Sequence, residues 1–508
     1  MIWLREAPWI GIACTSLTAD IYTRYIFTLI WMMQLWACSQ GGVNIVGQTD
    51  GTAPVFPDYD GVTVPYNIAP LNLSLTEPGE YHLNIAGTDG EINIRSKDGA
   101  FDIPLKAWRK LLVSNTDKEI IMRVSRETPE GWTAYRDIRV RVSAEAIDPY
   151  LAYRKIPPYE QWNRMGLYQR HLESFEETPI FENRMTDYGC VNCHTFNQRQ
   201  PDTFLFHSRA KAPGTAYINN GIVTKLNTRT EETRGNMQYP YWHPSGRYVV
   251  ASVNSTWESY YYHSDDRVEV FDTESDVFVY DMEKNEVFGS DLLASPRAYE
   301  TFPTFSPDGR SLYFCTAEAV DSVAYHIEQL KYSLCRVDFD AGTAAIGTRV
   351  DTLFNARKED MSISHPRISP DGRWMVVCLT RYGNFPANKK DADLYIIDMS
   401  SGEMKLLEGA NSDRADSYHS WGGNSHWMVF SSRRIDGYYS RPYITYIDEH
   451  GKAGKPFLLP QHNPAKFYND QMMSYNLPEL IEDRVKTSQR KIALTLRNTE
   501  GQNMSFRQ

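Results

Sequence analysis

A short cluster of cysteine and histidine is the part of this 508-residue sequence whose residue types could do chemistry. Cys190, Cys193 and His194 form the pattern Cys-x-x-Cys-His. Two thiols at this spacing can form thioether bonds to the two vinyl groups of a haem, and the adjacent imidazole can bind the iron. The sequence therefore predicts a covalent haem c, held by Cys190 and Cys193, with His194 as the proximal iron ligand.

The second axial ligand of such an iron is not fixed by the motif. His207 follows His194 by thirteen residues (207 − 194), at the end of a predicted strand, and is our first candidate. Met185, His171 and His243 are further candidates. An empty sixth position would instead leave room for a small ligand.

Two other roles for the cysteine pair stay open. Cys190 and Cys193 can form a local disulfide or remain structural thiols. A metal site is the other alternative, although zinc prefers four ligands and the sequence has no second Cys-x-x-Cys or His-x3-His pair. Beyond this pair and the two cysteines of the N-terminal region, three of the 7 cysteines remain, which cannot all pair: Cys315, Cys335 and Cys378. We therefore expect no disulfide framework.

The N-terminal region carries the features of an export signal. Arg24 precedes an apolar run over residues 25–37, and small polar residues follow Cys38. This order is typical of a cleaved signal peptide, and the run is shorter than the ~20 residues that span a bilayer. Because the end of the run resembles a lipoprotein box, we expect residues 1–38 to be an export segment with Cys38 as the lipidation site. An ordinary signal peptide with an incidental Cys38 is the alternative.

Composition narrows the classes of partner. The net charge is -11 and no Lys- or Arg-rich run is present. Nucleic acid is therefore not expected, because binding a polyphosphate needs a clustered basic face. The hydrophobic content of 42% and charged content of 23% are ordinary for globular proteins, and the length predicts several domains.

The first half of the chain predicts a β domain and a connector. Residues 50–146 alternate apolar and polar side chains between Gly-, Asp- and Pro-rich turns, which predicts a β-sandwich. Residues 147–187 are rich in Tyr, Arg and Glu and alternate little. We expect this connector to contain one or two short helices over residues 159–175.

A repeated turn organises residues 188–460. Pro244, Pro307 and Pro370 recur at equal steps of 63 residues (307 − 244 and 370 − 307), and each begins a turn that leads into an apolar strand. Proline followed by Ser or Asp and then Gly favours a tight turn. Several strands per unit without helical periodicity predict the blades of a β-propeller. We count five blades and allow a sixth, with the Cys-x-x-Cys-His site at the start.

The C-terminal tail, residues 461–508, is expected to pack across the propeller edge and close it, with residues 491–496 as a last strand. The tail is too short for an α/β peptidase domain, and the sequence has no Gly-x-Ser-x-Gly elbow. We therefore expect no enzyme activity.

The repeat resembles the blades of TolB-like β-propellers. Residues 64–72, residues 176–184 and the cysteine motif followed by propeller repeats resemble a group of exported Bacteroidetes proteins, described as TolB-like or as cytochrome c biosynthesis proteins. This resemblance implies an all-β lipoprotein anchored in the bacterial cell envelope, on the periplasmic face or the outer membrane, with a protein partner there.

Two functions are compatible with these features. The first is a haem-bearing binding or redox-sensing lipoprotein whose propeller is the recognition platform. The second is a non-haem envelope scaffold or assembly factor in which Cys190 and Cys193 are structural.

Overall fold

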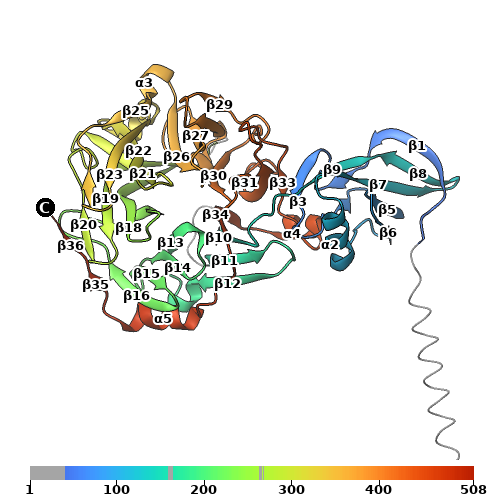
Figure 1. Ribbon diagram of the computed structural model, residues 1–508, viewed down its shortest axis with the longest axis horizontal. Coiled ribbons are helices and arrows are strands. Elements are labelled where there is room, and N and C mark those ends of the chain that lie inside the picture. Colours follow the sequence, from blue (N-terminus) through green and yellow to red (C-terminus); the bar gives the residue numbers. More distant parts are fainter. Residues whose placement is uncertain (1–40, 158–163, 262–265, 267, 508) are drawn as a thin grey trace, which may run out of the picture.

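The computed structural model describes residues 41–157, 164–261, 266 and 268–507 of the chain. A sheet domain formed by the first hundred of these residues lies beside a ring of six sheets (Figure 1). The ring is a six-bladed β-propeller, so the mainly β architecture and the propeller are confirmed, and the blade number is six. The expected export segment, with Cys38, lies outside the described residues. Within the described part of the chain, no helix is long and apolar enough to cross a membrane.

The N-terminal domain is built on one large mixed sheet. Its elements are β1 (Ile45–Thr52), β2 (Val55–Phe56), β3 (Val62–Pro65), β4 (Ser74–Leu75), β5 (Tyr81–Ala86), β6 (Glu91–Ser96), α2 (Leu105–Ser114), β7 (Glu119–Thr128), β8 (Gly131–Arg136) and β9 (Ile138–Ser143). Seven strands share the sheet in the order β1-β8-β7-β5-β6, with β9 joining β7 to β3, while β2 and β4 pair separately. The β-sandwich expected for this region is therefore not confirmed.

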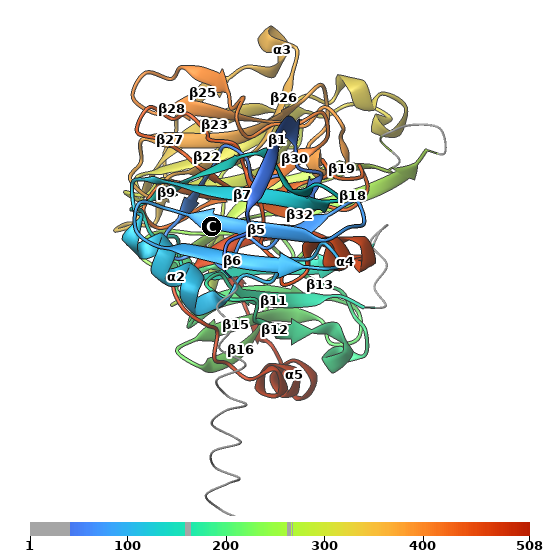
Figure 2. The same ribbon diagram turned by 90° about the vertical axis from the view of Figure 1, so that its right-hand side faces the viewer.

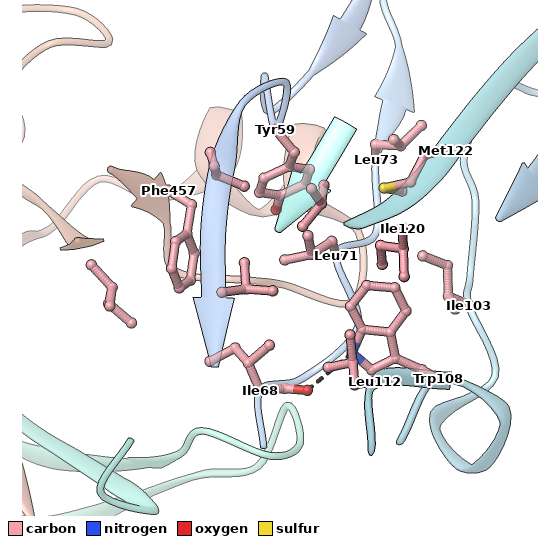
Figure 3. Packing of buried hydrophobic residues seen from close by; sticks show 14 of the residues in the cluster. Tyr59, Ile68, Leu71, Leu73, Ile103, Trp108, Leu112, Ile120, Met122 and Phe457 are labelled. Carbon is pink, nitrogen blue, oxygen red and sulfur yellow. Dashed lines mark hydrogen bonds between the residues drawn. The ribbon is translucent and has the colours of Figure 1, made fainter. Parts of the chain in front are cut away.

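Helix α2 packs against this sheet. Trp108, Leu111 and Leu112 are its buried residues, and their spacing places them on one side of a helix. The indole Nε1 of Trp108 donates to the carbonyl oxygen of Ile68 at 3.0 Å (Figure 3). The helix was missed because it occurs between strongly alternating strand segments, where a single ten-residue helix adds little to the sequence pattern.

The N-terminal domain shares a core with the sixth blade. Phe457 of that blade lies in the same buried cluster as Tyr59 and Leu71 (Figure 3). The indole Nε1 of Trp427 donates to the carbonyl oxygen of Glu145 at 3.0 Å. Figure 2, which views the molecule from the side of this domain, shows β5, β6 and β7 in front of the propeller. The domain is thus fixed to the outside of the ring rather than to its channel.

The six blades follow one another around the ring, each written here from its inner strand outward. Blade 1 contains β34 (Ser474–Ile481), β10 (Tyr150–Ile156), β11 (Gly166–His171) and β12 (Glu177–Glu182); blade 2 contains β13 (Val191–Phe196), β14 (Thr203–Ser208), β15 (Gly214–Asn219), β16 (Ile222–Asn227) and β35 (Gln502–Asn503); blade 3 contains β17 (Gln238–Trp242), β18 (Tyr248–Tyr260), β19 (Val268–Asp281), β20 (Glu286–Phe288) and β36 (Ser505–Phe506).

Blades 4 to 6 complete the ring. Blade 4 contains β21 (Ala298–Phe305), β22 (Ser311–Glu318), β23 (Ser333–Asp340), β24 (Ala345–Ile346) and β25 (Asp351–Phe354); blade 5 contains β26 (Ser362–Ile368), β27 (Trp374–Thr380), β28 (Asp393–Asp398) and β29 (Met404–Leu406); blade 6 contains β30 (Asp416–Trp421), β31 (Trp427–Ser432), β32 (Arg441–Tyr446) and β33 (Phe457–Leu458). The remaining helices are η2 (Asn183–Thr186), η3 (Asn197–Arg199), η4 (Val323–Tyr325), η5 (Ile327–Gln329), α3 (Ala356–Glu359), η6 (Pro386–Asn388), α4 (Pro464–Asp470) and α5 (Gln489–Asn498).

The expected helical connector is wrong, because residues 147–187 supply three strands of blade 1. Strand β10 lies between β11 and β34, and five of its seven residues are buried. A strand covered on both faces lacks the alternation of apolar and polar side chains by which we recognised the other strands. The helices expected over residues 159–175 are absent from the described residues 164–175, and residues 158–163 lie outside the description.

The C-terminal tail closes the propeller. Strand β34 pairs with β10 from Ile481 opposite Tyr150 to Ser474 opposite Ile156, and it is the inner strand of blade 1 (Figure 1). Blade 1 is therefore built from two chain segments that lie at opposite ends of the propeller sequence. The last strand expected over residues 491–496 is wrong, because these residues belong to helix α5, which buries Ile492, Ala493 and Leu496 on one face.

Candidate functional site

All six inner strands carry a bulge at the same position. The pairing of each inner strand with its neighbour shifts register there. The residue at each bulge has a φ between 47° and 53°, and these residues are Cys193, Tyr239, Phe302, His365, Tyr418 and Leu477. A left-handed backbone is uncommon for residues other than glycine, and a bulge re-aims the side chain that it carries. The six bulges are thus a shared feature of the blades.

Four of these bulge residues meet one another across successive blades. The ring centroids lie 4.5 Å apart for Tyr239 and Phe302, 3.9 Å for Phe302 and His365, and 5.1 Å for His365 and Tyr418. We call these four residues the aromatic partition. Since residues that precede the bulges line one cavity and residues that follow them line another, the partition stands between two cavities.

The cavity on the side of the repeated turns, here the turn-side cavity, has a volume of about 240 Å³. Cys193 and His194 line it, together with Arg367 of β26 and Glu479 of β34. Aromatic side chains form much of the remaining wall: Tyr241, Trp242, Phe305 and Trp421. Blades 1, 2 and 5 therefore bring four chemically active side chains to one cavity, of which the sequence motif contributes two.

His194 is a neutral imidazole in this cavity. Its side chain is 1% exposed, and Nε2 lies 3.4 Å from Oε1 of Glu479. Burial, helped by the positive charge of Arg154, lowers the pKa of His194 to about 3. Among the described residues neither ring nitrogen has a partner aligned for a hydrogen bond. The imidazole can thus accept or donate a hydrogen bond at neutral pH without carrying a charge.

Glu479 and Arg367 set the charge of the cavity. Burial raises the pKa of Glu479 to about 8, although the carboxyl accepts a hydrogen bond from the backbone N–H of Phe196 at 3.2 Å. Glu479 is therefore mostly protonated at neutral pH. Arg367 stays cationic, because burial lowers the pKa of a guanidinium from far above neutral. Its guanidinium carbon lies 5.0 Å from the centre of the Tyr241 ring. The cavity thus carries net positive charge.

The structure separates the two cysteines of the motif. Cys190 packs with Ile156 and Met165 and lines neither cavity, whereas Cys193 lines the turn-side cavity. None of the five cysteines in the described part of the chain takes part in a disulfide, so the local disulfide is not formed. Within those same residues no group of three or more His, Cys, Asp or Glu side chains could hold a metal ion.

A haem does not fit this arrangement. Covalent attachment requires both thiols and the imidazole at one macrocycle, but Cys190 lies outside the cavity that Cys193 and His194 line. A cavity of 150 Å³ accommodates benzene, so about 240 Å³ holds roughly ten non-hydrogen atoms, far fewer than a porphyrin has. Haem attachment stays a prediction from the sequence, and no chemistry is derived from it below.

His207 is not brought to His194. It lines neither cavity, its Nδ1 lies 2.7 Å from Oγ1 of Thr215, and burial followed by the charge of Arg209 lowers its pKa to about 3. The other candidates for a second axial ligand also lie outside the turn-side cavity: Met185, His171 and His243. The structure thus gathers Cys193 and His194 and leaves the remaining predicted ligands elsewhere.

Sequence analysis missed Arg367 and Glu479. Each follows a bulge residue by two positions, as 367 − 365 and 479 − 477 show. In three blades the bulge residue itself precedes the repeated proline by five positions: Tyr239, Phe302 and His365. Aligning the repeats on these positions would have revealed the common register. It would also have placed Cys193 and His194 at the bulge of blade 2, as part of a propeller strand.

Comparisons with solved structures find similarity at low sequence identity. No family model and no curated protein matches the chain. A periplasmic gluconolactonase of Pseudomonas aeruginosa is 13% identical, with a TM-score of 0.32, over 78% of this chain and 99% of that one. Dipeptidyl peptidase 4 of Porphyromonas gingivalis is 9% identical, with a TM-score of 0.30, over 66% and 58%. Prolyl oligopeptidase B of Galerina marginata is 11% identical, with a TM-score of 0.30, over 67% and 42%.

The chain thus spans 42% to 58% of the length of these two peptidases. Our expectation that the chain is not an enzyme is corrected by this finding, because the similar solved structures are enzymes. At these identities and TM-scores the likeness assigns no activity to this chain.

Proposed function

We propose that this chain is an exported, lipid-anchored protein of the cell envelope whose propeller binds a small organic acid in the turn-side cavity. The observation that carries the proposal is the partly buried guanidinium of Arg367 on the wall of this cavity. Its Nη1 donates to the carbonyl oxygen of Pro366 at 2.8 Å, and no described carboxylate forms an ion pair with it. A guanidinium held away from water is costly unless a carboxylate or similar anion meets it.

The walls of the cavity favour a ligand with an apolar body. Trp242 donates its indole Nε1 to the carbonyl oxygen of Thr195 at 3.3 Å, and Trp421 donates to that of Arg367 at 3.0 Å. These bonds hold both indoles against the backbone of neighbouring inner strands. A fixed aromatic wall with a few charged groups, here Arg367 and the ion-paired Arg199, is the usual character of a small-molecule pocket. Neutral His194 and protonated Glu479 add hydrogen-bonding groups without cancelling the charge of Arg367.

The envelope setting comes from the sequence. Residues 1–38 have the order of an export signal that ends at Cys38, and the repeats resemble TolB-like propellers. An anchored binding protein of this kind would have a protein partner in the envelope. Cys190 and Cys193 are then structural thiols, as in the non-haem alternative, and Cys193 forms part of the cavity wall.

Ligand-dependent stabilisation of the purified full chain tests the binding proposal. We would measure thermal unfolding with a panel of carboxylates of up to about ten non-hydrogen atoms, such as benzoate, beside alcohols of the same skeleton. A ligand at one hundred times its Kd stabilises the folded state by about 2.7 kcal/mol. We expect carboxylates, and not the alcohols, to raise the Tm.

Two variants decide where such a ligand binds. Arg367→Gln should abolish the shift, and Arg310→Gln, an exposed arginine beside the turn of blade 4, should keep it. No shift with any carboxylate, or an equal shift in Arg367→Gln, would overturn the proposal.

The visible spectrum of protein from its native envelope separates this proposal from the haem-bearing alternative. We expect a protein without a Soret band. A Soret band that stays with the denatured polypeptide and disappears in Cys190→Ala/Cys193→Ala would show covalent haem and contradict the structural role of the thiols.

A further inference from the structure

The second cavity, on the other side of the aromatic partition, gathers arginines from three neighbouring blades. It lies beside the long hairpin of β18 and β19, and we call it the hairpin-side cavity; its volume is about 320 Å³. Arg154 of blade 1, Arg209 of blade 2 and Arg433 of blade 6 all line it. Glu258 is the one carboxylate among its described lining residues. Among the described lining residues, arginines therefore outnumber carboxylates.

Arg154 is the most enclosed of these arginines. The residue is 4% exposed, and its Nε has no hydrogen-bond partner among the described residues. When the amide of Asn476 is oriented to satisfy both of its ends, its oxygen accepts from Nη2 of Arg154 at 3.1 Å. That partner is neutral, and no described carboxylate pairs with Arg154. A buried guanidinium without a counterion is a strong candidate for anion recognition.

The other two arginines lie in different surroundings. Arg209 is half-buried, and no described carboxylate forms an ion pair with it. Arg433 donates to Oδ1 of Asn388 at 2.9 Å and to Oγ of Ser440 at 3.4 Å, both neutral groups. The carboxylate of Glu258 accepts from the hydroxyl of Tyr260 on the same hairpin.

The positive charges of these arginines help to lower the pKa values of two neighbouring histidines. Arg209 contributes to the lowered pKa of His207, and Arg154 contributes to the lowered pKa of His194, in both cases after burial. Both histidines are therefore neutral and add no charge of their own. A small anion entering the cavity would meet a positive potential to which Arg154 and Arg209 contribute.

The rest of the wall combines amide and phenol groups. Gln238 and Asn476 line the cavity next to the bulges of their strands, and Tyr438 lies at the exposed rim with 52% of its surface accessible. Amides and phenols can bond to several hydroxyl groups at once, and an aromatic ring can lie against a sugar ring. We propose that the hairpin-side cavity is a second binding site, which takes an acidic sugar through Arg154 and Arg209.

Isothermal titration of the purified full chain with D-glucuronate tests this site, with D-glucose as the matched neutral sugar. We expect glucuronate to bind at least about tenfold more tightly than glucose, since charge-assisted hydrogen bonds are worth ~1.5–3 kcal/mol. Arg209→Gln and Arg154→Gln should each weaken glucuronate at least about tenfold. Because Arg154 is buried and its variant could fail to fold, the half-buried Arg209 keeps the test decisive.

Arg367→Gln is the control that separates this proposal from the one for the turn-side cavity. It should leave glucuronate affinity unchanged, because Arg367 lines the other cavity. Equal affinity for glucose and glucuronate, or glucuronate binding that survives Arg209→Gln in folded protein, would overturn the inference. Displacement of glucuronate by an equal concentration of inorganic phosphate would also overturn it, since the cavity would then be a general anion site.

Discussion

Blades 3 to 5 differ from blades 1 and 2 in the turn that follows the inner strand. In blades 3 to 5 the inner strand leads into a repeated turn at Pro244, Pro307 and Pro370. Blade 1 takes its inner strand from the C-terminal tail, and blade 2 follows its inner strand with η3, where Gln198 has a φ of 46°. All five nevertheless share the bulge of the inner strand. The bulge is therefore a general feature of these blades, whereas the repeated turn is not.

The polar groups of the two cavities come mainly from the irregular blades. Blade 1 supplies Arg154 and Glu479, and blade 2 supplies His194 and Arg209. The regular blades contribute most of the aromatic partition. Repetition thus builds most of the aromatic partition, whereas the charged side chains come from the irregular blades and, in the case of Arg367, from regular blade 5.

Of the changes considered, removal of the C-terminal tail should destabilise the propeller most. Deletion of residues 471–508 takes away β34, whose Tyr475, Leu480 and Ile481 are at most 1% exposed. Burying each contributes about 1.5–3 kcal/mol, which together approaches the ~5–15 kcal/mol that stabilises a typical domain. We expect no cooperative thermal unfolding of the truncated chain, measured by circular dichroism.

A shorter truncation is the matched control. Deletion of residues 499–508 removes β35 and β36, each of which pairs over two residues at the outer edge of a blade, together with the buried side chain of Met504. This chain should still unfold cooperatively, with a Tm lowered by a few degrees. Similar loss of folding in both truncations would mean that the outer strands, rather than closure at blade 1, hold the ring together.

Two glycines sharpen the comparison between blade 2 and blade 5. A Cβ at Gly189 would lie 2.2 Å from the backbone oxygen of Arg209, whereas one at Gly372 would have nothing within 4 Å. Gly372 has a φ of 75°, so its replacement by alanine costs about 1–2 kcal/mol in backbone strain. Gly189→Ala forces the backbone of two strands apart and should cost about 3 kcal/mol or slightly more.

Urea unfolding of both alanine variants measures the two free energies. A smaller loss for Gly189→Ala than for Gly372→Ala would mean that the entry to blade 2 is free to adjust. The cysteine motif would then lie in a less constrained segment than the close approach to Arg209 indicates.

The propeller could be predicted because its turns repeat. The step of 63 residues between successive prolines identified blades 3 to 5 without any tertiary information. Blade 1 could not be found in this way: β10 is covered on both faces, and its neighbour β34 lies more than three hundred residues later in the chain. Pairing over such a distance leaves no periodic signal in either segment.

The candidate site could be predicted only in part. Cys193 and His194 lie in β13 and line a cavity, but Cys190 precedes that strand and packs with Ile156 and Met165. Our interpretation of the Cys-x-x-Cys-His motif assumed that its side chains face one common site, and the backbone of the blade does not place them so. Arg367 and Glu479 were missed because each is a single charged residue in its strand, and its position on the channel follows only from the shared bulge.

Glu479 should make the stability of the propeller depend on pH. Burial raises its pKa from 4.5 to about 8, so the folded state retains a proton that the unfolded state releases above pH 4.5. The stability that this group contributes is complete below its unfolded pKa and is lost as pH rises through about 8. The fall in Tm between about pH 5 and about pH 8.5 should be smaller, by a few degrees, in Glu479→Gln than in the wild type.

Glu482→Gln provides the comparison on the same tail. Its carboxylate lies 3.2 Å from Arg199, and its side chain is 41% exposed. This variant should keep the pH dependence of the wild type. Parallel curves for Glu479→Gln and the wild type would mean that the Glu479 carboxyl is ionised in the folded protein, and the turn-side cavity would then be neutral rather than positive.

The smallest effects are expected from the two cysteines, and their difference addresses how the motif is folded. Cys190 packs with Ile156 and Met165, so Cys190→Ala should cost about 1 kcal/mol through lost contacts. Cys193 borders a cavity, so Cys193→Ala removes fewer contacts and should cost only a few tenths of a kcal/mol. Chemical unfolding of the two single variants measures both values. Equal losses would mean that the two thiols share one environment, as attachment to a common group requires, and would count against their separation into blade core and cavity wall.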